Sequence, residues 1–351
     1  MIKFRAGGKQ HTHTTKRKLM DFSVIIPAYN AEKTLPDCIH ALKNQIDVPG
    51  TYEIILVDNG SNDLTVDLAK AAGWQVAVQT KRGPGACRNM GLSIAQGDII
   101  CFTDADCAPL ENWISEVTQP LREDSSITGC KGVYKTHQKT VAARFVQAEY
   151  EGKYQLLAQQ EQIDFIDTYC AAYRHEALQE VNGFNEDFQK AEDTEMAYRL
   201  ASSGHKLVFQ PKAVVYHTHS ATLFDFFVKK IQTAYWVAQL VRKHPRYGVR
   251  DSHNPQITKI QMLIMLLFLC ALGAAPIWGI FDLGSWIRIP GINLPAWASL
   301  LLALVFASTT LPSAIIRWNK DRVIALLSPM LVAIRTLGHT IGYIWGVLRP
   351  I

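Results

Sequence analysis

Two long, almost uncharged apolar stretches near the C-terminus place the strongest limit on what this chain can fold into. Residues 260–281 and 295–316 are rich in Leu, Ile and Ala. Each is about as long as the roughly 20 residues that an α-helix needs to cross a bilayer. Runs of this length are rare in soluble domains, where such helices would have to be buried on every side. We therefore expect two membrane-spanning helices.

A third apolar stretch, residues 323–348, is less regular. Arg335 and His339 interrupt it with polar side chains, and Pro329 and several glycines break its helical pattern. It can cross the bilayer, lie tilted or re-enter, and the sequence leaves these alternatives open. Residues 259–351 are thus predicted to form a transmembrane region with two or three helices.

The charged residues indicate on which side of the membrane the rest of the chain lies. Residues 1–20 carry no acidic charge and lack the apolar core of a secretory signal, which predicts a basic disordered tail and a cytosolic domain. The basic linker 317–322 contrasts with a single arginine in 282–294, in agreement with this orientation. We expect a multi-pass protein of the cell (inner) membrane with its large domain in the cytoplasm.

Overall charge and cysteine content exclude some classes of protein. The net charge of +5 is interpreted as attraction to anionic lipid headgroups. No nucleic-acid partner is expected, because neither a zinc motif nor stacking aromatic residues accompany the basic residues. Seven cysteines without a Cys-x-x-Cys pair indicate reduced thiols rather than a disulfide framework.

The segment before the first apolar stretch, residues 222–258, combines apolar and basic side chains. Phe227, Ile231 and Tyr235 recur at helical spacing beside Lys229 and Lys230. This pattern predicts amphipathic helices at the membrane interface. Packing of the same apolar side against the soluble domain is the alternative.

Residues 21–221 alternate between strand-like and helix-like segments, which predicts an α/β domain. Short apolar runs at 22–27, 53–58, 75–78 and 98–103 are separated by segments with helical spacing. Such a pattern is typical of a parallel sheet covered by helices on both faces. A further strand at 127–134, a helix at 141–160, a helix opened by Glu192 and a strand at 213–216 follow.

Polar residues follow several of these strands. Pro27 to Asn30, Asp58 and the pair Asp104 and Asp106 all come where an apolar run ends. Ligands of open α/β sheets bind beyond the carboxyl ends of the strands, so we expect one shared cleft. Alternate residues of an extended chain point the same way, so Asp104 and Asp106 can converge on one divalent cation. A turn or helix cap is the plainer explanation of the pair.

Five motifs in order give the chain a family resemblance. They are Ser23–Asn30, Val57–Ser61, Gly83–Asn89, Asp104-Ala105-Asp106 and Glu192-Asp193. With them the chain resembles the family 2 glycosyltransferases of GT-A fold, membrane-anchored bacterial type. The resemblance implies a Rossmann-like mixed sheet flanked by helices, and inverting, metal-dependent transfer of a sugar from a nucleotide diphosphate to an acceptor. The membrane segments suggest a lipid or lipid-linked acceptor.

The resemblance also implies roles for individual residues. Asp193 is expected to be the catalytic base, although acids at the start of a helix also have a structural explanation in the helix dipole. The metal, Mg²⁺ or Mn²⁺, is expected on Asp104, Asp106 and His217, with His219 as the alternative. The expected donor-binding residues are Pro27, Ala28, Tyr29, Asn30, Asp58, Gly83, Gly85, Arg88, Asp104 and Glu192.

One departure from the family pattern concerns the product. Processive members carry a Gln-x-x-Arg-Trp motif near the membrane, whereas this chain has Tyr235 before Trp236 where that arginine belongs. We therefore expect transfer of one or a few sugars, as by a hexosyltransferase. Two other hypotheses are a catalytically silent, membrane-anchored binding or assembly module of the same fold, and a nucleotidyltransferase that makes sugar nucleotides.

Overall fold

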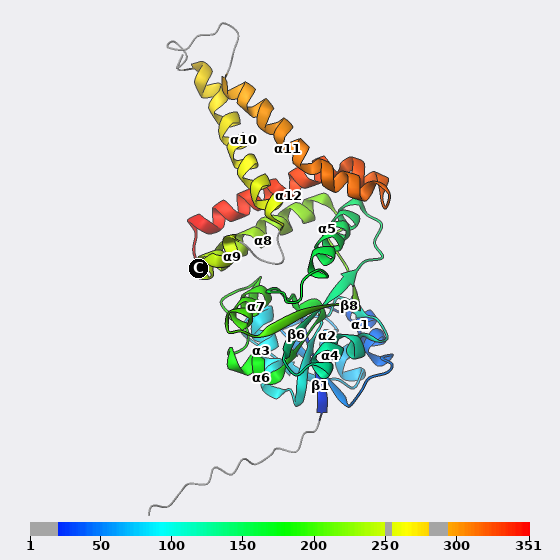
Figure 1. Cartoon of the computed structure of the whole chain (residues 1–351). Coiled ribbons are helices and arrows are strands. Elements are labelled where there is room, and N and C mark those ends of the chain that lie inside the picture. Colours follow the sequence, from blue (N-terminus) through cyan, green and yellow to red (C-terminus); the bar gives the residue numbers. More distant parts are fainter. Residues whose placement is uncertain (1–19, 250–254, 281–293) are drawn as a thin grey trace, which may run out of the picture.

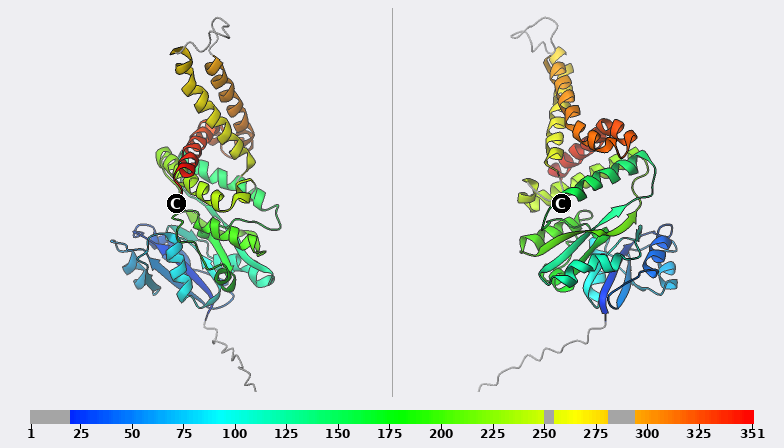
Figure 2. Two further views of the ribbon diagram at one scale, coloured as in Figure 1. Left: turned by 90° about the vertical axis from the view of Figure 1, so that its left-hand side faces the viewer. Right: turned by 45° about the vertical axis from the view of Figure 1, so that its right-hand side comes forward.

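The computed structural model describes residues 20–249, 255–280 and 294–351 (Figure 1). Except for Met20, the predicted basic tail lies outside the described residues. A sheet with helices on both faces forms one body, and the C-terminal helices lie on one side of it (Figures 1 and 2).

An eight-stranded mixed sheet forms the centre of the large domain. Its strand order is β3-β2-β1-β4-β7-β6-β8-β5, and β1 lies parallel between β2 and β4. Strand β7 runs antiparallel to both of its neighbours, so the parallel arrangement predicted from the first half of the domain stops at β4. The strands are β1 (Met20–Ala28), β2 (Tyr52–Asp58), β3 (Gln75–Val78), β4 (Gly97–Phe102), β5 (Cys107–Pro109), β6 (Ile127–Lys135), β7 (Ala171–Arg174) and β8 (Lys206–His217).

Alternating side chains of the sheet fill two separate cores. Val24 and Ile26 of β1 point to one face and Ile25 to the other, because successive side chains of a strand alternate. The first core is closed by α1 and α4, and the second by α3 and α7. The helices of this domain are α1 (Leu35–Lys43), α2 (Thr65–Ala71), α3 (Pro84–Ile94), α4 (Trp113–Glu123), α5 (Val141–Leu157), α6 (His175–Glu180) and α7 (Glu192–Ser202), with a 3-10 turn at Thr168–Cys170.

Most predicted elements are confirmed, with shifted ends. Strands β1 to β4 and helix α7 begin within two residues of their predicted starts. Helix α3 begins at Pro84, because proline suits the first turn of a helix and Gly83 before it adopts a φ of 121°. Helix α4 and the short β5 and β7 were not predicted.

The C-terminal part consists of α8 (Leu223–Lys243), α9 (Pro245–Val249), α10 (Gln256–Ile280), α11 (Leu294–Trp318) and α12 (Arg322–Leu348). By length and composition, α10, α11 and α12 could each cross a membrane. In Figure 1, α10 and α11 rise together away from the sheet domain, whereas α12 lies across their base beside α8. The irregular third apolar stretch therefore forms one continuous helix, α12, whose axis does not follow those of α10 and α11.

Three glycines let α12 lie directly on α8. Added Cβ atoms at Gly338, Gly342 and Gly346 would meet the backbone of α8, and the one at Gly342 would overlap the carbonyl oxygen of Ile231. Gln239 of α8 also donates to the carbonyl oxygen of Gly346 at 2.8 Å. Because residue numbers rise together along this contact, the two helices run parallel.

Helix α5 connects the sheet domain to the C-terminal helices. Phe145 of α5 packs edge-to-face on Phe226 of α8 in a core that also contains residues of α10, α11 and α12. Glu149 of α5 forms ion pairs with Arg335 of α12 and Lys230 of α8. These contacts hold the C-terminal helices in a defined position relative to the sheet.

Candidate active site

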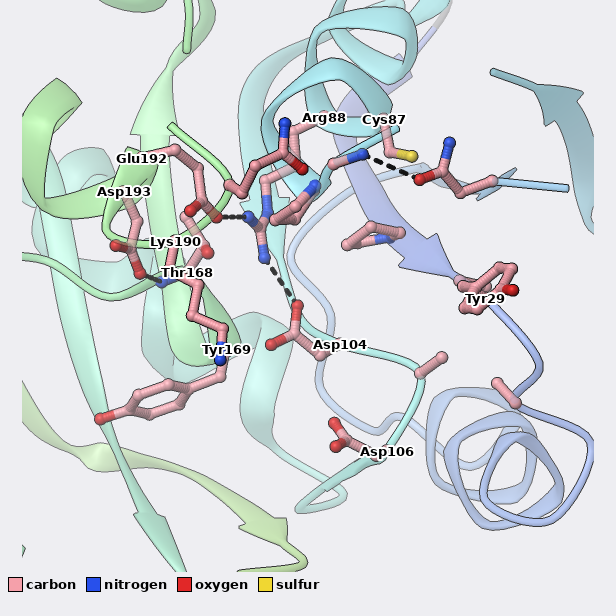
Figure 3. Close-up of a pocket in the computed structure, with 18 of the residues that line it drawn as sticks. Tyr29, Cys87, Arg88, Asp104, Asp106, Thr168, Tyr169, Lys190, Glu192 and Asp193 are labelled. Carbon is pink, nitrogen blue, oxygen red and sulfur yellow. Dashed lines mark hydrogen bonds and ion pairs between the residues drawn. The ribbon is translucent and has the colours of Figure 1, made fainter. Parts of the chain in front are cut away.

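A cavity of about 760 Å³ lies beyond the carboxyl ends of β1, β2 and β4, where the sequence predicted one. We call it the first cavity. It brings together residues from seven separate segments of the chain, and several of them are drawn in Figure 3. Of the predicted site residues, its wall contains Pro27, Ala28, Tyr29, Asn30, Gly83, Arg88, Asp104, Asp106, Glu192 and Asp193.

Asp58 was expected to bind the donor, but its neighbour Asn59 is the residue that lines the first cavity. The Asp58 carboxylate is 3% exposed, accepts hydrogen bonds from the backbone N–H groups of Gly60 and Ser61, and is not on the cavity wall. Asn59 is on the wall, and its side-chain oxygen accepts a hydrogen bond from Gly83 N–H at 3.0 Å. Asp58 thus shapes the loop after β2, and Asn59 links this loop to the start of α3.

The two predicted glycines permit close packing at the start of α3. Gly83 faces the side chain of Gln189, and a Cβ at Gly85 would touch Glu192. Only Gly83 lines the first cavity. Gly85 is explained by the contact between α3 and α7.

Arg88 joins the acidic residues of the site. Its Nη1 lies 2.5 Å from Oε1 of Glu192, and its Nη2 lies 2.8 Å from Oδ1 of Asp104 (Figure 3). Burial opposes the charge on Arg88, but the carboxylates of Asp104 and Glu192 raise the pKa of its guanidinium above the usual value. The side chain therefore holds β4 and α7 together and positions both acids.

Asp104 and Asp106 do not point to the same partner. Asp104 binds Arg88, whereas Oδ2 of Asp106 lies 3.4 Å from Nε2 of His217. Burial opposes ionisation of Asp106, but the hydrogen bond with His217 lowers the pKa of its carboxyl. Desolvation instead raises the pKa of Asp104. The pairing brings the end of β8 next to the loop after β4.

Asp106 and His217 form a candidate metal centre. Their ligand atoms and the Cys107 sulfur lie within 4.8 Å of one another. Burial raises the pKa of the Cys107 thiol well above its ordinary value, so this thiol stays neutral and does not suit a hard cation. A carboxylate oxygen with an imidazole nitrogen suits Mn²⁺. The donor atoms present therefore fit a divalent ion.

His219 has a different environment from His217. It is 5% exposed, packs against Tyr134, and is outside the group formed by Asp106, Cys107 and His217. Burial, and then the nearby His217, lower the pKa of His219 to about 3, so its ring is neutral. Of the two predicted alternatives, the geometry favours His217.

Asp193 lies in the first turn of α7 with both carboxylate oxygens engaged. Oδ2 accepts a hydrogen bond from Thr168 N–H at 3.3 Å, and Oδ1 accepts one from Thr194 N–H at 2.7 Å. Ala191, the residue just before α7, has a φ of 62°, and this left-handed conformation turns the chain sharply into the helix. The side chain is thereby directed to the wall of the first cavity (Figure 3).

A second cavity, of about 640 Å³, lies between the sheet domain and the C-terminal helices. It has side chains of α5, α8, α10 and α12 on its wall. Five residues line both cavities, which are therefore adjacent: Tyr169, Lys190, Ala191, Asp193 and Lys229.

The shared wall contains residues that sequence reasoning missed. The Tyr169 hydroxyl accepts a hydrogen bond from Lys131 Nζ at 2.9 Å and forms a second one with the Tyr154 hydroxyl at 3.1 Å, which fixes its position. Lys190 precedes α7, and Lys229 is on α8. The proximity of Lys190 to Glu192 and Asp193 in the sequence was a usable signal, whereas Lys229 is brought in only by tertiary packing.

Comparison with known proteins gives a consistent result. Residues 23–181 match the family model described as "Glycosyl transferase family 2". A pre-mycofactocin glycosyltransferase of Mycobacterium tuberculosis is 25% identical over 240 residues, 64% of this chain and 48% of the relative. An O-antigen chain rhamnosyltransferase of Salmonella typhimurium is 28% identical over 228 residues, 61% of this chain and 71% of the relative. The match thus spans about half the length of the first relative.

One solved structure supports the fold. It is the mannosyltransferase PcManGT from Pyrobaculum calidifontis in complex with GDP-Man and Mn²⁺. The TM-score is 0.58 at 18% sequence identity, over 94% of this chain and 88% of that chain. At this identity the similarity concerns the fold.

Proposed function

Because this chain is a glycosyltransferase of family 2 with the GT-A fold, we propose that it transfers a single hexose from a nucleoside diphosphate donor to a lipid or lipid-linked acceptor at the membrane. The transfer inverts the anomeric carbon and depends on a divalent metal. The first cavity takes the donor, and the second takes the acceptor.

The observation that carries this proposal is the position of Asp193 where the two cavities meet. Its carboxylate lines both of them, together with Lys190 and Lys229. A donor and an acceptor bound in neighbouring cavities have their reacting atoms at the common wall. A general base has to lie at this common wall, because it accepts the proton of the attacking hydroxyl.

The chemistry is one displacement. The acceptor hydroxyl oxygen forms a bond to the anomeric carbon while the bond from that carbon to the diphosphate breaks, and the hydroxyl proton passes to Asp193. The hydrogen bonds from Thr168 and Thr194 hold the Asp193 carboxylate in place for this role. Lys190 and Lys229 offer positive charge at the same wall, where the leaving diphosphate becomes more negative.

The proposed metal ligands are Asp106 and His217. Asp104 forms an ion pair with Arg88 instead. A bound Mg²⁺ or Mn²⁺ would neutralise charge on the diphosphate. The donor atoms of these side chains support this assignment, as does the Mn²⁺ in the complex of the structurally similar mannosyltransferase.

Two features support a short product. Lys190 Nζ contacts the side-chain oxygen of Gln232, so this glutamine of the modified motif lies beside the shared wall. The Tyr235 hydroxyl donates to the carbonyl oxygen of Arg349 at 3.1 Å, and its ring packs on Trp345. Tyr235 is thus occupied by the contact between α8 and α12 rather than available to a growing polymer.

We also propose the arrangement of the chain at the membrane. Residues 21–221 form the catalytic domain on the cytoplasmic side of the inner membrane, 222–258 lie at the interface, and 259–351 contain the spans. The apolar surface of α10 and α11 supports this, since Leu263, Leu301 and Leu304 are each more than half exposed.

The test is an assay of the full-length protein in detergent with a panel of nucleotide sugars, Mn²⁺ and a membrane lipid extract as acceptor. Released nucleoside diphosphate is measured. Asp193→Asn should lower the turnover about 10²- to 10⁴-fold, because the attacking hydroxyl loses its base. Asp187→Asn, on the exposed loop before α7, is the matched control and should keep full turnover.

Other outcomes would contradict the proposal. Full turnover of a folded Asp193→Asn variant would remove the assigned base. Release of pyrophosphate instead of nucleoside diphosphate would indicate a nucleotidyltransferase. No turnover of the wild type with any donor would favour the catalytically silent module.

A further inference from the structure

Lys131 is a charged side chain buried inside the sheet domain. It lies on β6 and is 1% exposed. Its ammonium group forms an ion pair with Asp167 and donates a hydrogen bond to the Tyr169 hydroxyl at 2.9 Å. The same group lies 4.8 Å from the centroid of the Tyr169 ring. Burial lowers the pKa of Lys131, because the ammonium group loses its water, and these two side chains replace the solvent.

The two partners of Lys131 flank Thr168 in the sequence. Asp167 precedes this residue and Tyr169 follows it, in the 3-10 turn that begins at Thr168. Thr168 is itself 1% exposed and donates its backbone N–H to Oδ2 of Asp193 at 3.3 Å (Figure 3). The group that contacts the proposed base therefore lies between two side chains that one lysine holds.

The Tyr169 hydroxyl is also held from α5. It lies 3.1 Å from the Tyr154 hydroxyl, which accepts a hydrogen bond from the backbone N–H of Tyr134 at 3.1 Å. Tyr169 lines both cavities, Asp167 lines only the second, and Lys131 lines neither. Lys131 is thus outside the space proposed for donor and acceptor, so it acts on the transfer only through the residues that it holds.

We propose that Lys131 and Asp167 are positioning residues for the transfer, because they hold the turn from which Thr168 N–H fixes the carboxylate of Asp193. This rests on the proposed function, since it takes Asp193 as the base. It goes beyond that function by giving a lysine outside both cavities a part in the reaction. A displacement of about 1 Å at the reacting groups can cost about 100-fold in rate, so the support of the base matters for turnover.

The experiment removes both charges of the pair at once, in the full-length protein in detergent. Lys131→Met alone would leave the Asp167 carboxylate buried without its cation, which is strongly destabilising. The double variant Lys131→Met/Asp167→Asn leaves no unpaired charge, so its thermal unfolding midpoint should stay close to that of the wild type. Tyr169→Phe is the second variant, because it keeps both charges and the ring and removes only the hydroxyl that accepts from Lys131.

The expected loss is in turnover and not in nucleotide binding. With membrane lipid extract as acceptor, the double variant should lower kcat at least about tenfold. Tyr169→Phe should lower kcat about fivefold, the factor that corresponds to one hydrogen bond. Binding of UDP and GDP to the double variant should be unchanged, since Lys131 and Asp167 are not on the wall of the first cavity.

Lys135→Met is the matched control. This lysine is exposed at the end of the same strand and should keep full turnover when replaced. Wild-type kcat in a folded double variant would overturn the inference, as would weakened nucleotide binding. If the double variant does not fold, wild-type kcat in Tyr169→Phe would overturn it.

A further comparison separates positioning of the base from a general structural role. Residues that act through Asp193 have no carboxylate left to position once it is replaced. The change at Lys131 and Asp167 should therefore lower the residual turnover of Asp193→Asn by less than about twofold. A loss by the same factor in both backgrounds would show a structural role and overturn the inference.

Failure of this inference can be distinguished from failure of the proposed function. Full turnover of a folded Asp193→Asn variant would count against the proposed function, because the assigned base would not be needed. Reduced turnover of Asp193→Asn together with full turnover of the folded Lys131→Met/Asp167→Asn variant would count against this inference alone.

Discussion

Arg88 Nη1 and Glu192 Oε1 lie 2.5 Å apart, although 104 positions separate the two residues in the chain. Both side chains are buried. The same guanidinium binds Asp104, so one cation sets the distance between the loop after β4 and the first turn of α7. The metal-binding side of the site and the proposed base are aligned by this contact.

Replacing Arg88 should therefore destabilise the fold. Arg88→Met leaves Glu192 buried without its cation, which typically costs about 3 kcal/mol or more of unfolding free energy. The thermal unfolding midpoint in detergent measures the loss. Arg122→Met, on the exposed side of α4, should change the midpoint little. Equal midpoints for the two variants would show that the buried ion pair does not hold α3 to α7.

If Asp106 and His217 bind the metal, replacing either one should weaken Mn²⁺ binding, whereas replacing the neighbouring His219 should not. Asp106→Asn and His217→Ala should each weaken Mn²⁺ binding at least about tenfold, measured by titration of the purified protein followed by electron paramagnetic resonance. His219→Ala is the control and should bind Mn²⁺ like the wild type, because this ring is outside the group of ligand atoms. A larger loss for His219→Ala than for His217→Ala would reverse the assignment.

The raised pKa of Glu192 should make the stability of the fold depend on pH. Burial, and then the Asp193 carboxylate, raise its pKa from 4.5 to about 7 in spite of Arg88. A carboxyl group with a raised pKa in the folded state stabilises the fold when protonated, fully below its unfolded pKa, and this contribution is lost as the pH rises through about 7. The unfolding midpoint of the wild type should thus fall more steeply than that of Glu192→Gln between about pH 5 and 8. Glu176→Gln, an exposed carboxylate, should keep the wild-type slope, and the same slope in Glu192→Gln would contradict the prediction.

Much of the first cavity could be predicted from the sequence. Parallel strands end at one edge of a sheet, so Tyr29, Asn30 and Asp106 were expected to meet once the strands were located. The partners of the charged side chains could not be predicted. The sequence does not show that Arg88 binds Glu192. It also does not show that Asp106 lies beside His217, because the pairing of β5 with β8 brings these two side chains together.

The second cavity depends on packing that periodicity does not describe. The glycines at 338, 342 and 346 have the spacing of a close helix contact, but nothing in this spacing identifies α8 as the partner. Once α8 is bound to α12, Lys229 faces the sheet domain and the shared wall is complete. Tertiary contacts between distant helices therefore create the acceptor side of the site.

The contact between α8 and α12 can be tested at its narrowest point. Gly342→Leu should lower the unfolding midpoint and reduce turnover, because the side chain overlaps the backbone at Ile231 and forces the helices apart. Overpacking of this kind costs about 1–3 kcal/mol. Gly273→Leu is the matched control, since a Cβ at Gly273 of α10 meets nothing within 4 Å. A tolerated Gly342→Leu would mean that the helices are not held by this contact.

The direction of α12 determines on which side of the membrane the C-terminus lies. Helix α12 lies parallel to α8, and α8 carries Lys229, Lys230, Arg242 and Lys243, so a spanning α12 would take these charges into the bilayer. We therefore expect only α10 and α11 to cross, which returns the C-terminus to the side of the catalytic domain. Protease digestion of sealed inverted membrane vesicles measures this, with one epitope tag at each end of the chain. Both tags should be cleaved together, and a protected C-terminal tag beside a cleaved N-terminal tag would show that α12 is a third span.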